Sequence, residues 1–146
     1  MTLTRMIDAP RETVFNAWID QDQLAAWWGP KGFTNPVCEI DAKPGGRIFI
    51  HMQAPDGAVY PMDGQFHEII FPEKLVFTSA ALDDEGQRLF EVLNTVTFTE
   101  EAAKTKIILE AVVSNIRSEG KHHINGMQEG WSGSIDRLEE LVKQPG

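Results

Sequence analysis

The sequence predicts one α+β domain, residues 1–146, in which a curved antiparallel sheet of about six or seven strands packs against a long C-terminal helix. Three observations lead to this fold class. An amphipathic stretch ends the chain, short segments separated by turn residues fill its middle, and two short helical segments follow the first strand. With 42% hydrophobic residues, a chain of this length can bury one sizeable core.

The chain opens with a strand and two short helices. Leu3–Ile7 is predicted as the first strand, and Pro10 suits the first turn of a helix because its missing N–H is not needed there. A second helix is predicted over Gln21–Trp28 and ends at Gly29-Pro30. The apolar residues that give the first helix its periodicity are Val14, Phe15, Trp18 and Ile19.

The middle of the chain predicts six further strands. Glycine, proline and acidic residues separate them, and such short links favour antiparallel neighbours because parallel pairing needs a long crossover. The predicted strands are Val37–Asp41, Arg47–Gln53, Val59–Ile70, Lys74–Leu82, Leu89–Thr99 and Thr105–Val113.

The C-terminal stretch predicts a helix over about Glu119–Lys143, with Ser118 as its N-cap and Pro145-Gly146 as its end. Its apolar stripe is the natural partner of the apolar face of the sheet. Three glycines interrupt the stretch, and they either allow close backbone packing or leave room for a cavity. The stripe consists of Ile124, Met127, Trp131, Ile135, Leu138 and Val142, and the glycines are Gly126, Gly130 and Gly133.

The composition argues against several classes of function. The formal net charge is −9, from 22 acidic and 13 basic residues, so phosphate backbones are repelled and nucleic-acid binding is not expected. No apolar run approaches the ~18 residues of a membrane span, and the first residues lack the apolar segment of a signal peptide. The single cysteine, Cys38, is compatible with a reducing compartment. We expect a cytoplasmic protein, either a monomer or a homodimer.

No motif predicts a metal, a cofactor or a catalytic group. The segment 130–134, Gly-Trp-Ser-Gly-Ser, approaches the nucleophile elbow of serine hydrolases but ends in Ser134 instead of glycine and lies within a helix. His122 and His123 are adjacent, so on a helix they point about 100° apart and are poorly placed to chelate one ion.

Two titratable side chains in the predicted strands have open roles. His51 shares a strand face with Phe49 and is interpreted either as a hydrogen-bonded wall residue or as a ligand contact. Glu68 follows Gly64 and Phe66 at period two, so it is either buried as a polar anchor or exposed at an edge. We expect that His51 and Glu68 do not form a catalytic pair.

Several segments occur together in a recognisable order and spacing. They are Ile7-Asp8-Ala9-Pro10, Trp27-Trp28-Gly29-Pro30, Pro44-Gly45-Gly46, Gly64-x-Phe66-x-Glu68-Ile69, Pro72-x-x-Leu75-Val76-Phe77-Thr78 and Gly126-Met127-x-x-Gly130-Trp131. This order and spacing resemble those of the stand-alone bacterial branch of the activator of heat-shock-protein-ninety ATPase family, within the START/SRPBCC superfamily of the birch-pollen-allergen fold. The match extends over roughly Arg5 to Leu141.

This resemblance implies a helix-grip fold with a hydrophobic cavity between the sheet and the C-terminal helix. We therefore expect the protein to bind a small hydrophobic or amphipathic molecule, without catalysis. The alternatives are a module that regulates a chaperone, or an enzyme similar to polyketide cyclases. The residues expected to bind the ligand are Trp28, Phe49, His51, Tyr60, Phe66, Glu68, Phe77, Met127, Trp131 and Ile135.

The segment from Trp27 to Thr34 is a candidate gate for this cavity. Gly29 and Gly32 permit backbone change while Pro30 fixes one point. The alternative is that the tryptophans of this segment simply anchor the short helix to the core.

Overall fold

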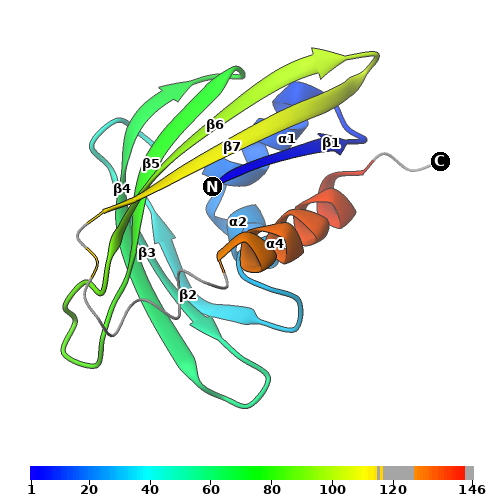
Figure 1. Ribbon diagram of the computed structural model, residues 1–146. Helices are drawn as coiled ribbons and strands as arrows, with labels where there is room; N and C mark the ends of the chain where they lie inside the picture. Colours follow the sequence, from blue (N-terminus) through cyan, green and yellow to red (C-terminus); the bar gives the residue numbers. More distant parts are fainter. Residues whose placement is uncertain (115, 117–126, 144–146) are drawn as a thin grey trace.

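The concave side of a curved seven-stranded antiparallel sheet holds the helices (Figure 1). The computed structural model describes residues 1–114, 116 and 127–143. The strands are β1 (Thr2–Ile7), β2 (Thr34–Ile40), β3 (Arg47–Gln53), β4 (Val59–Ile70), β5 (Lys74–Ala81), β6 (Glu91–Glu101) and β7 (Lys104–Ser114). The helices are α1 (Arg11–Ile19), α2 (Gln21–Trp27) and α4 (Met127–Val142).

The strands from β2 to β7 pair with their neighbours in the chain, and β1 completes the sheet by pairing with β7, in the order β1-β7-β6-β5-β4-β3-β2. The predicted fold class is therefore confirmed, including the two short helices after the first strand. The predicted start of the last helix at Glu119, its cap Ser118 and its end at Pro145-Gly146 lie outside the described residues.

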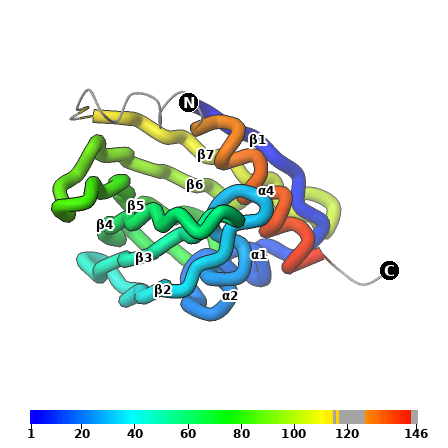
Figure 2. The backbone as a smooth tube through the Cα atoms, turned by 90° about the horizontal axis from the view of Figure 1, so that it is seen from below, coloured from blue at the N-terminus to red at the C-terminus, as the bar shows by residue number. Residues whose placement is uncertain are grey.

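Helices α1 and α2 lie beside α4 on the concave side (Figure 2). Asp20 separates the two short helices, and its carboxylate caps α2 by accepting hydrogen bonds from the backbone N–H groups of Asp22 and Gln23. None of the helices in the described part of the chain is long and apolar enough to cross a membrane.

Aromatic side chains from α1 and α2 form the centre of the core. Phe15, Trp18 and Trp27 are at most 2% exposed. Two buried polar groups beside them are paired: the Trp27 indole N–H donates to Ala17 O at 2.9 Å, and the Thr105 hydroxyl donates to Ala9 O at 2.7 Å. The buried indole N–H of Trp18 has no acceptor among the described residues. The two bonds fix α1 to α2, and Ala9 just before α1 to β7, so the sheet and the short helices form one packed unit.

A register shift in β4 divides that strand into two parts. Up to Phe66 every second residue faces the core, and Phe66 pairs with Phe77. Between Phe66 and Glu68 a bulge adds one residue, after which Ile69 packs against the core and Glu68 turns outward. The period-two pattern that placed Glu68 beside Phe66 is interrupted by this extra residue.

Gly64 in β4 allows a close backbone contact. An ideal Cβ at this position would lie 1.9 Å from the carbonyl oxygen of Thr78 on β5. Real Cβ atoms do not approach a backbone oxygen so closely, so any side chain here forces β4 and β5 apart.

We expect Gly64→Ala to lower the free energy of unfolding by at least about 3 kcal/mol, because the clash involves backbone and cannot be relieved by a rotamer change. Urea denaturation of the wild type and the variant measures this loss. A change smaller than about 1 kcal/mol would show that the two strands separate easily at this point.

Candidate functional site

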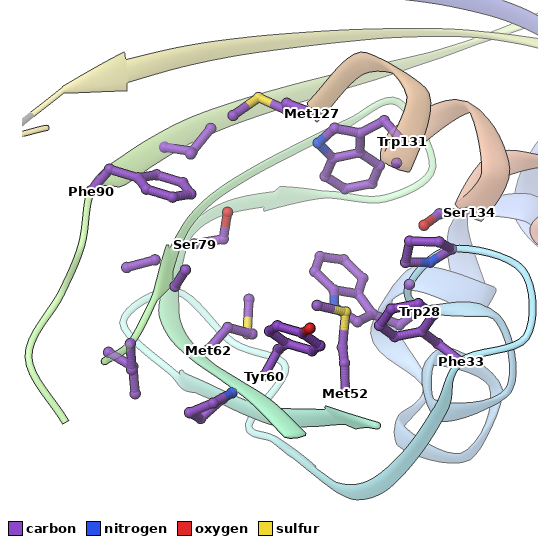
Figure 3. Close-up of a pocket in the computed structure, with 18 residues that line it drawn as sticks. Trp28, Phe33, Met52, Tyr60, Met62, Ser79, Phe90, Met127, Trp131 and Ser134 are labelled. Carbon is purple, nitrogen blue, oxygen red and sulfur yellow. The ribbon is translucent and has the colours of Figure 1, made fainter. Parts of the chain in front are cut away.

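A cavity opens between the first half of α4, the loop after α2, and the end of the sheet where β4 and β6 begin (Figure 3). Its volume is about 320 Å³, and ligand pockets typically measure ~300–1,000 Å³. Among the described residues that line it, none is charged, and the lining hydroxyls are those of Tyr60, Ser79 and Ser134. The cavity is therefore apolar with a few polar points.

The two halves of α4 have different surroundings. Ile135, Leu138 and Val142 in the second half are buried in the core. The residues of the first half face the cavity and recur at i, i+3, i+4 and i+7, which places them on one side of a helix. They are Met127, Gly130, Trp131 and Ser134.

Four tryptophans form a closed ring of contacts at the base of the cavity. Trp18 lies 4.7 Å from Trp27 and 5.9 Å from Trp131, measured between ring centroids. Trp28 completes the ring at 5.9 Å from Trp27 and 5.3 Å from Trp131. Trp28 and Trp131 line the cavity, whereas Trp18 and Trp27 are core residues, so the aromatic cluster joins the cavity wall to the core.

Arg137 of α4 holds the loop that forms one side of the cavity. Its Nη1 donates to the carbonyl oxygens of Trp28, Gly29 and Pro30 at 2.9–3.0 Å, and its Nη2 donates to Ala26 O at 3.0 Å. Partial burial lowers the pKa of Arg137 from its ordinary value. The guanidinium binds backbone dipoles here, and this favours the interpretation of the loop as an anchored wall over that of a gate.

The neighbouring residue Asp136 ties α4 to β1 and to the same loop. Its carboxylate accepts a hydrogen bond from Arg5 at 2.6 Å and pairs with Lys31 at 3.3 Å. The hydrogen bond from Arg5 is the largest cause that lowers the pKa of Asp136. Arg5 also donates to the Ser132 hydroxyl at 3.1 Å, so the serine of the segment 130–134 takes part in a structural contact.

Four of the ten residues expected to bind a ligand lie together in the cavity wall: Trp28, Tyr60, Met127 and Trp131. Phe66 and Phe77 point to the same side of the sheet and Ile135 of α4 packs in the same core, but all three are at most 3% exposed. They pack the core beneath the cavity.

The structure places the remaining three predicted residues on the outer face of the sheet. Ile48 and Ile50 occupy the core-facing positions of β3, so the alternation of the strand turns Phe49 and His51 outward, where their rings lie 5.0 Å apart. Glu68 is turned outward by the bulge in β4 and pairs with Lys74 at 3.6 Å. These placements correct the expectation that the three side chains bind a ligand in the cavity, and for Glu68 they agree with the alternative of an exposed carboxylate.

His51 and Glu68 are also far apart. His51 pairs with Pro61, seven residues before Glu68 on β4, and at ~3.3 Å per residue this separates them by roughly 23 Å. The two groups do not converge on one substrate. In the described part of the chain, no group of three or more His, Cys, Asp or Glu residues is arranged to hold a metal ion; His122 and His123 lie outside it.

Further lining residues were not among the predicted ligand contacts. Met52 follows Ile48 and Ile50 on the inner face of β3, so the alternation of that strand contained the signal. Phe90 is the last residue of the link between β5 and β6. It lies two positions before Val92 within the predicted strand Leu89–Thr99, so the alternation of that strand also contained a signal. Nothing in its own strand distinguishes Ser79 in the sequence. Its contact in the cavity wall is with Asn94 on the neighbouring strand β6.

The two described glycines of α4 support different interpretations. A Cβ at Gly133 would lie 3.7 Å from backbone atoms of Pro30 and Lys31, so this glycine packs closely against the loop. A Cβ at Gly130 would meet nothing within 4 Å. Gly130 therefore leaves open space beside the cavity, and Gly126 lies outside the described residues.

Comparisons with known proteins agree with this architecture. The family model for Activator of Hsp90 ATPase homolog 1-like protein matches residues 8–143. No protein with a curated description matches this chain.

Solved bacterial structures share the fold along nearly the whole chain. A Nitrosomonas europaea protein is 27% identical with a TM-score of 0.79, and the match covers 97% of this chain and 92% of that one. The AHSA1 protein from Silicibacter pomeroyi is 26% identical with a TM-score of 0.79, covering 96% and 94%. A Mycobacterium smegmatis protein is 26% identical with a TM-score of 0.80, covering 99% and 91%.

We expect Arg137→Met to destabilise the protein by about 2–4 kcal/mol, because four carbonyls lose a charged donor. The Phe33 amide, which donates to Pro30 O, should exchange its hydrogen faster, as measured by NMR. Arg137→Lys should give a stability loss and an exchange rate between those of the wild type and Arg137→Met, because an ammonium keeps the charge but lacks the planar fork of a guanidinium. Glu140→Ala on the exposed face of the same helix is the control. Unchanged exchange at Phe33 in Arg137→Met would contradict the anchoring role.

Proposed function

Because this chain belongs to the family of Activator of Hsp90 ATPase homolog 1-like proteins, whose fold commonly encloses a hydrophobic binding site, we propose that it binds a small hydrophobic or amphipathic molecule between its sheet and α4. The observation that carries this proposal is the apolar cavity of about 320 Å³ with no charged side chain among its described lining residues. Concave apolar surfaces with a few polar groups are the usual form of ligand sites.

The aromatic and methionine side chains of the wall suit such a ligand. Trp28 and Trp131 offer flat faces, and Met52, Met62 and Met127 are flexible and polarisable, so they adapt to irregular shapes. At the rim, the rings of Phe33 and Tyr60 lie 6.0 Å apart. Tyr60 is 40% exposed, which places its hydroxyl where an amphipathic ligand would meet water.

The alternative functions have weaker support. The exposed large apolar side chains in the described residues are distributed over β1, β4, β6, β7 and α4 and do not indicate one docking surface for a chaperone. An enzyme would need titratable groups that converge on the cavity, and the polar side-chain groups of the described lining residues are hydroxyls and indole N–H groups.

We also propose that the protein resides in a reducing compartment such as the cytoplasm. Cys38 is the single cysteine. Burial raises the pKa of its thiol to about 11, with a smaller contribution from Asp22. The thiol donates weakly to Gln21 O at 3.7 Å. It is therefore a structural side chain and not a reactive one.

Filling the cavity from Gly130 tests the proposal directly. We expect Gly130→Leu to weaken binding of the neutral fluorescent probe N-phenyl-1-naphthylamine by at least about tenfold, because the new side chain occupies cavity space. Fluorescence titration gives the affinity. Stability should not fall, since Gly130 has open space around it and glycine within a helix costs about 0.5–1 kcal/mol relative to alanine.

Gln128→Leu, on the exposed side of the same turn, is the matched control and should bind the probe as the wild type does. Native mass spectrometry of gently purified protein adds a second readout, since a retained ligand raises the mass. Equal probe affinities in both variants, or no binding to the wild type, would refute the proposal.

Trp131→Ala separates packing from binding. Trp131 is only partly buried because one side faces the cavity. We therefore expect a stability loss of about 1–3 kcal/mol, below the ~3–5 kcal/mol of a fully buried tryptophan, together with at least tenfold weaker probe binding. Denaturation and titration on the same samples measure both. A full core-sized stability loss with unchanged affinity would assign Trp131 to the core alone.

A further inference from the structure

A buried asparagine interrupts the apolar inner face of β6. The inward positions of this strand hold Val92, Val96 and Phe98, and between them Asn94 is completely buried at 0% exposure. Its Oδ1 has no hydrogen-bond partner in the described part of the chain. A buried unpaired acceptor costs roughly 1–3 kcal/mol, so an apolar side chain would suit the core better. The position of Asn94 therefore requires an explanation other than packing.

The amide nitrogen of Asn94 points toward the cavity wall. Nδ2 lies 3.0 Å from the Ser79 hydroxyl oxygen and 3.4 Å from Phe77 O, both on β5. A carbonyl oxygen can only accept a hydrogen bond. The atom of the Asn94 amide that faces Phe77 O is therefore the nitrogen and not the oxygen. Asn94 pairs with Phe77 across the two strands, and Ser79 is its diagonal neighbour.

This contact determines which hydrogen bond Ser79 still offers. Because Nδ2 donates to the Ser79 oxygen, the hydroxyl hydrogen must point elsewhere. Within the described ranges no acceptor for it is found. Ser79 lines the cavity, and its oxygen points into the space between Phe90 and Trp131 (Figure 3). Asn94 thus holds Ser79 as a donor aimed into the cavity.

The surroundings restrict which group can accept this bond. A carboxylate or phosphate would meet no cationic partner among the described lining residues, none of which is charged, and the chain carries a net charge of −9. Removing an anion from water under these conditions is costly. A neutral carbonyl oxygen accepts the bond without this penalty.

Building on the proposed function, we propose that the ligand is a neutral apolar molecule with a carbonyl oxygen, and that this oxygen accepts a hydrogen bond from Ser79. Asn94 is a positioning residue: it does not touch the ligand but orients the hydroxyl that does. The remaining cavity wall supplies apolar contact.

Three probes of nearly the same shape test this inference. They are 2-acetonaphthone, 2-isopropenylnaphthalene, in which a CH₂ group replaces the carbonyl oxygen, and 2-naphthoate, which is an anion. Calorimetric titration gives the three dissociation constants. The ketone loses hydrogen bonds to water on binding, and this cost is the same for every variant. The readout is therefore the ratio of the alkene dissociation constant to the ketone dissociation constant, compared between variants. The carboxylate should bind at least about tenfold more weakly than the ketone.

The variants separate the two roles. Ser79→Ala should lower the ratio by roughly 5- to 10-fold, the effect of one buried hydrogen bond, and leave alkene binding unchanged. Asn94→Leu should lower the ratio by a smaller factor, whereas a purely structural role would change both affinities equally. Ser114→Ala, an exposed serine at the end of β7, is the control and should keep the wild-type ratio.

A spectroscopic readout does not depend on the variants' stability. The carbonyl stretch of bound ¹³C-labelled 2-acetonaphthone should lie at lower wavenumber than in an apolar solvent, because a hydrogen bond weakens the C=O bond. If the ratio is the same in the wild type and Ser79→Ala, or falls instead in Ser134→Ala, the inference fails while cavity binding stands. If none of the three probes binds while N-phenyl-1-naphthylamine does, the inference fails and the proposed function stands. If N-phenyl-1-naphthylamine does not bind either, the proposed function fails and the inference with it.

Discussion

The whole arrangement depends on one constraint: a curved sheet has more concave surface than a single helix can cover. The second half of α4 meets the core with Ile135, Leu138 and Val142, which are almost completely buried. The first half leaves a gap above the sheet, which Gly130, Trp131 and Ser134 face, while Met127 reaches the cluster of Phe90 and Val92. The short helices α1 and α2 fill the deepest part of the concavity with aromatic side chains. The cavity is the portion of the concave surface that neither group covers.

A cavity of this kind persists only if its walls do not collapse inward. On one side Arg137 binds three backbone carbonyls of the loop after α2 and that of Ala26 within α2, and Asn35 adds hydrogen bonds to Ala25 O and Trp28 O. On the other side the continuous ladder of β4, β5 and β6 fixes the strands. The wall residues are therefore held by backbone contacts outside the cavity, which leaves their side chains available to a ligand.

The fold was readable from the sequence because each element carries its own local pattern. The turns with glycine and acidic residues bounded the strands, and Trp27-Trp28-Gly29-Pro30 marked the end of α2. The wall residues were harder to predict. A single extra residue in the β4 bulge turned Glu68 outward, and period-two reasoning cannot detect such an insertion. Phe49 was selected for its aromatic ring although Ile48 and Ile50 already defined the inner face of β3. The role of Ser79 depends on Asn94, fifteen positions away, and no local pattern contains that relation.

The ring of Trp18, Trp27, Trp28 and Trp131 contains every tryptophan of the chain. Their indole chromophores therefore cannot be treated as independent reporters. At these centroid distances their transition dipoles couple, so the near-ultraviolet circular dichroism belongs to the cluster as a whole. Excitation energy also passes among the four rings before emission. Part of the light that Trp18 and Trp27 absorb in the core is thus emitted by Trp28 and Trp131 at the cavity wall. The tryptophan fluorescence of the folded protein therefore reports chiefly on this cluster.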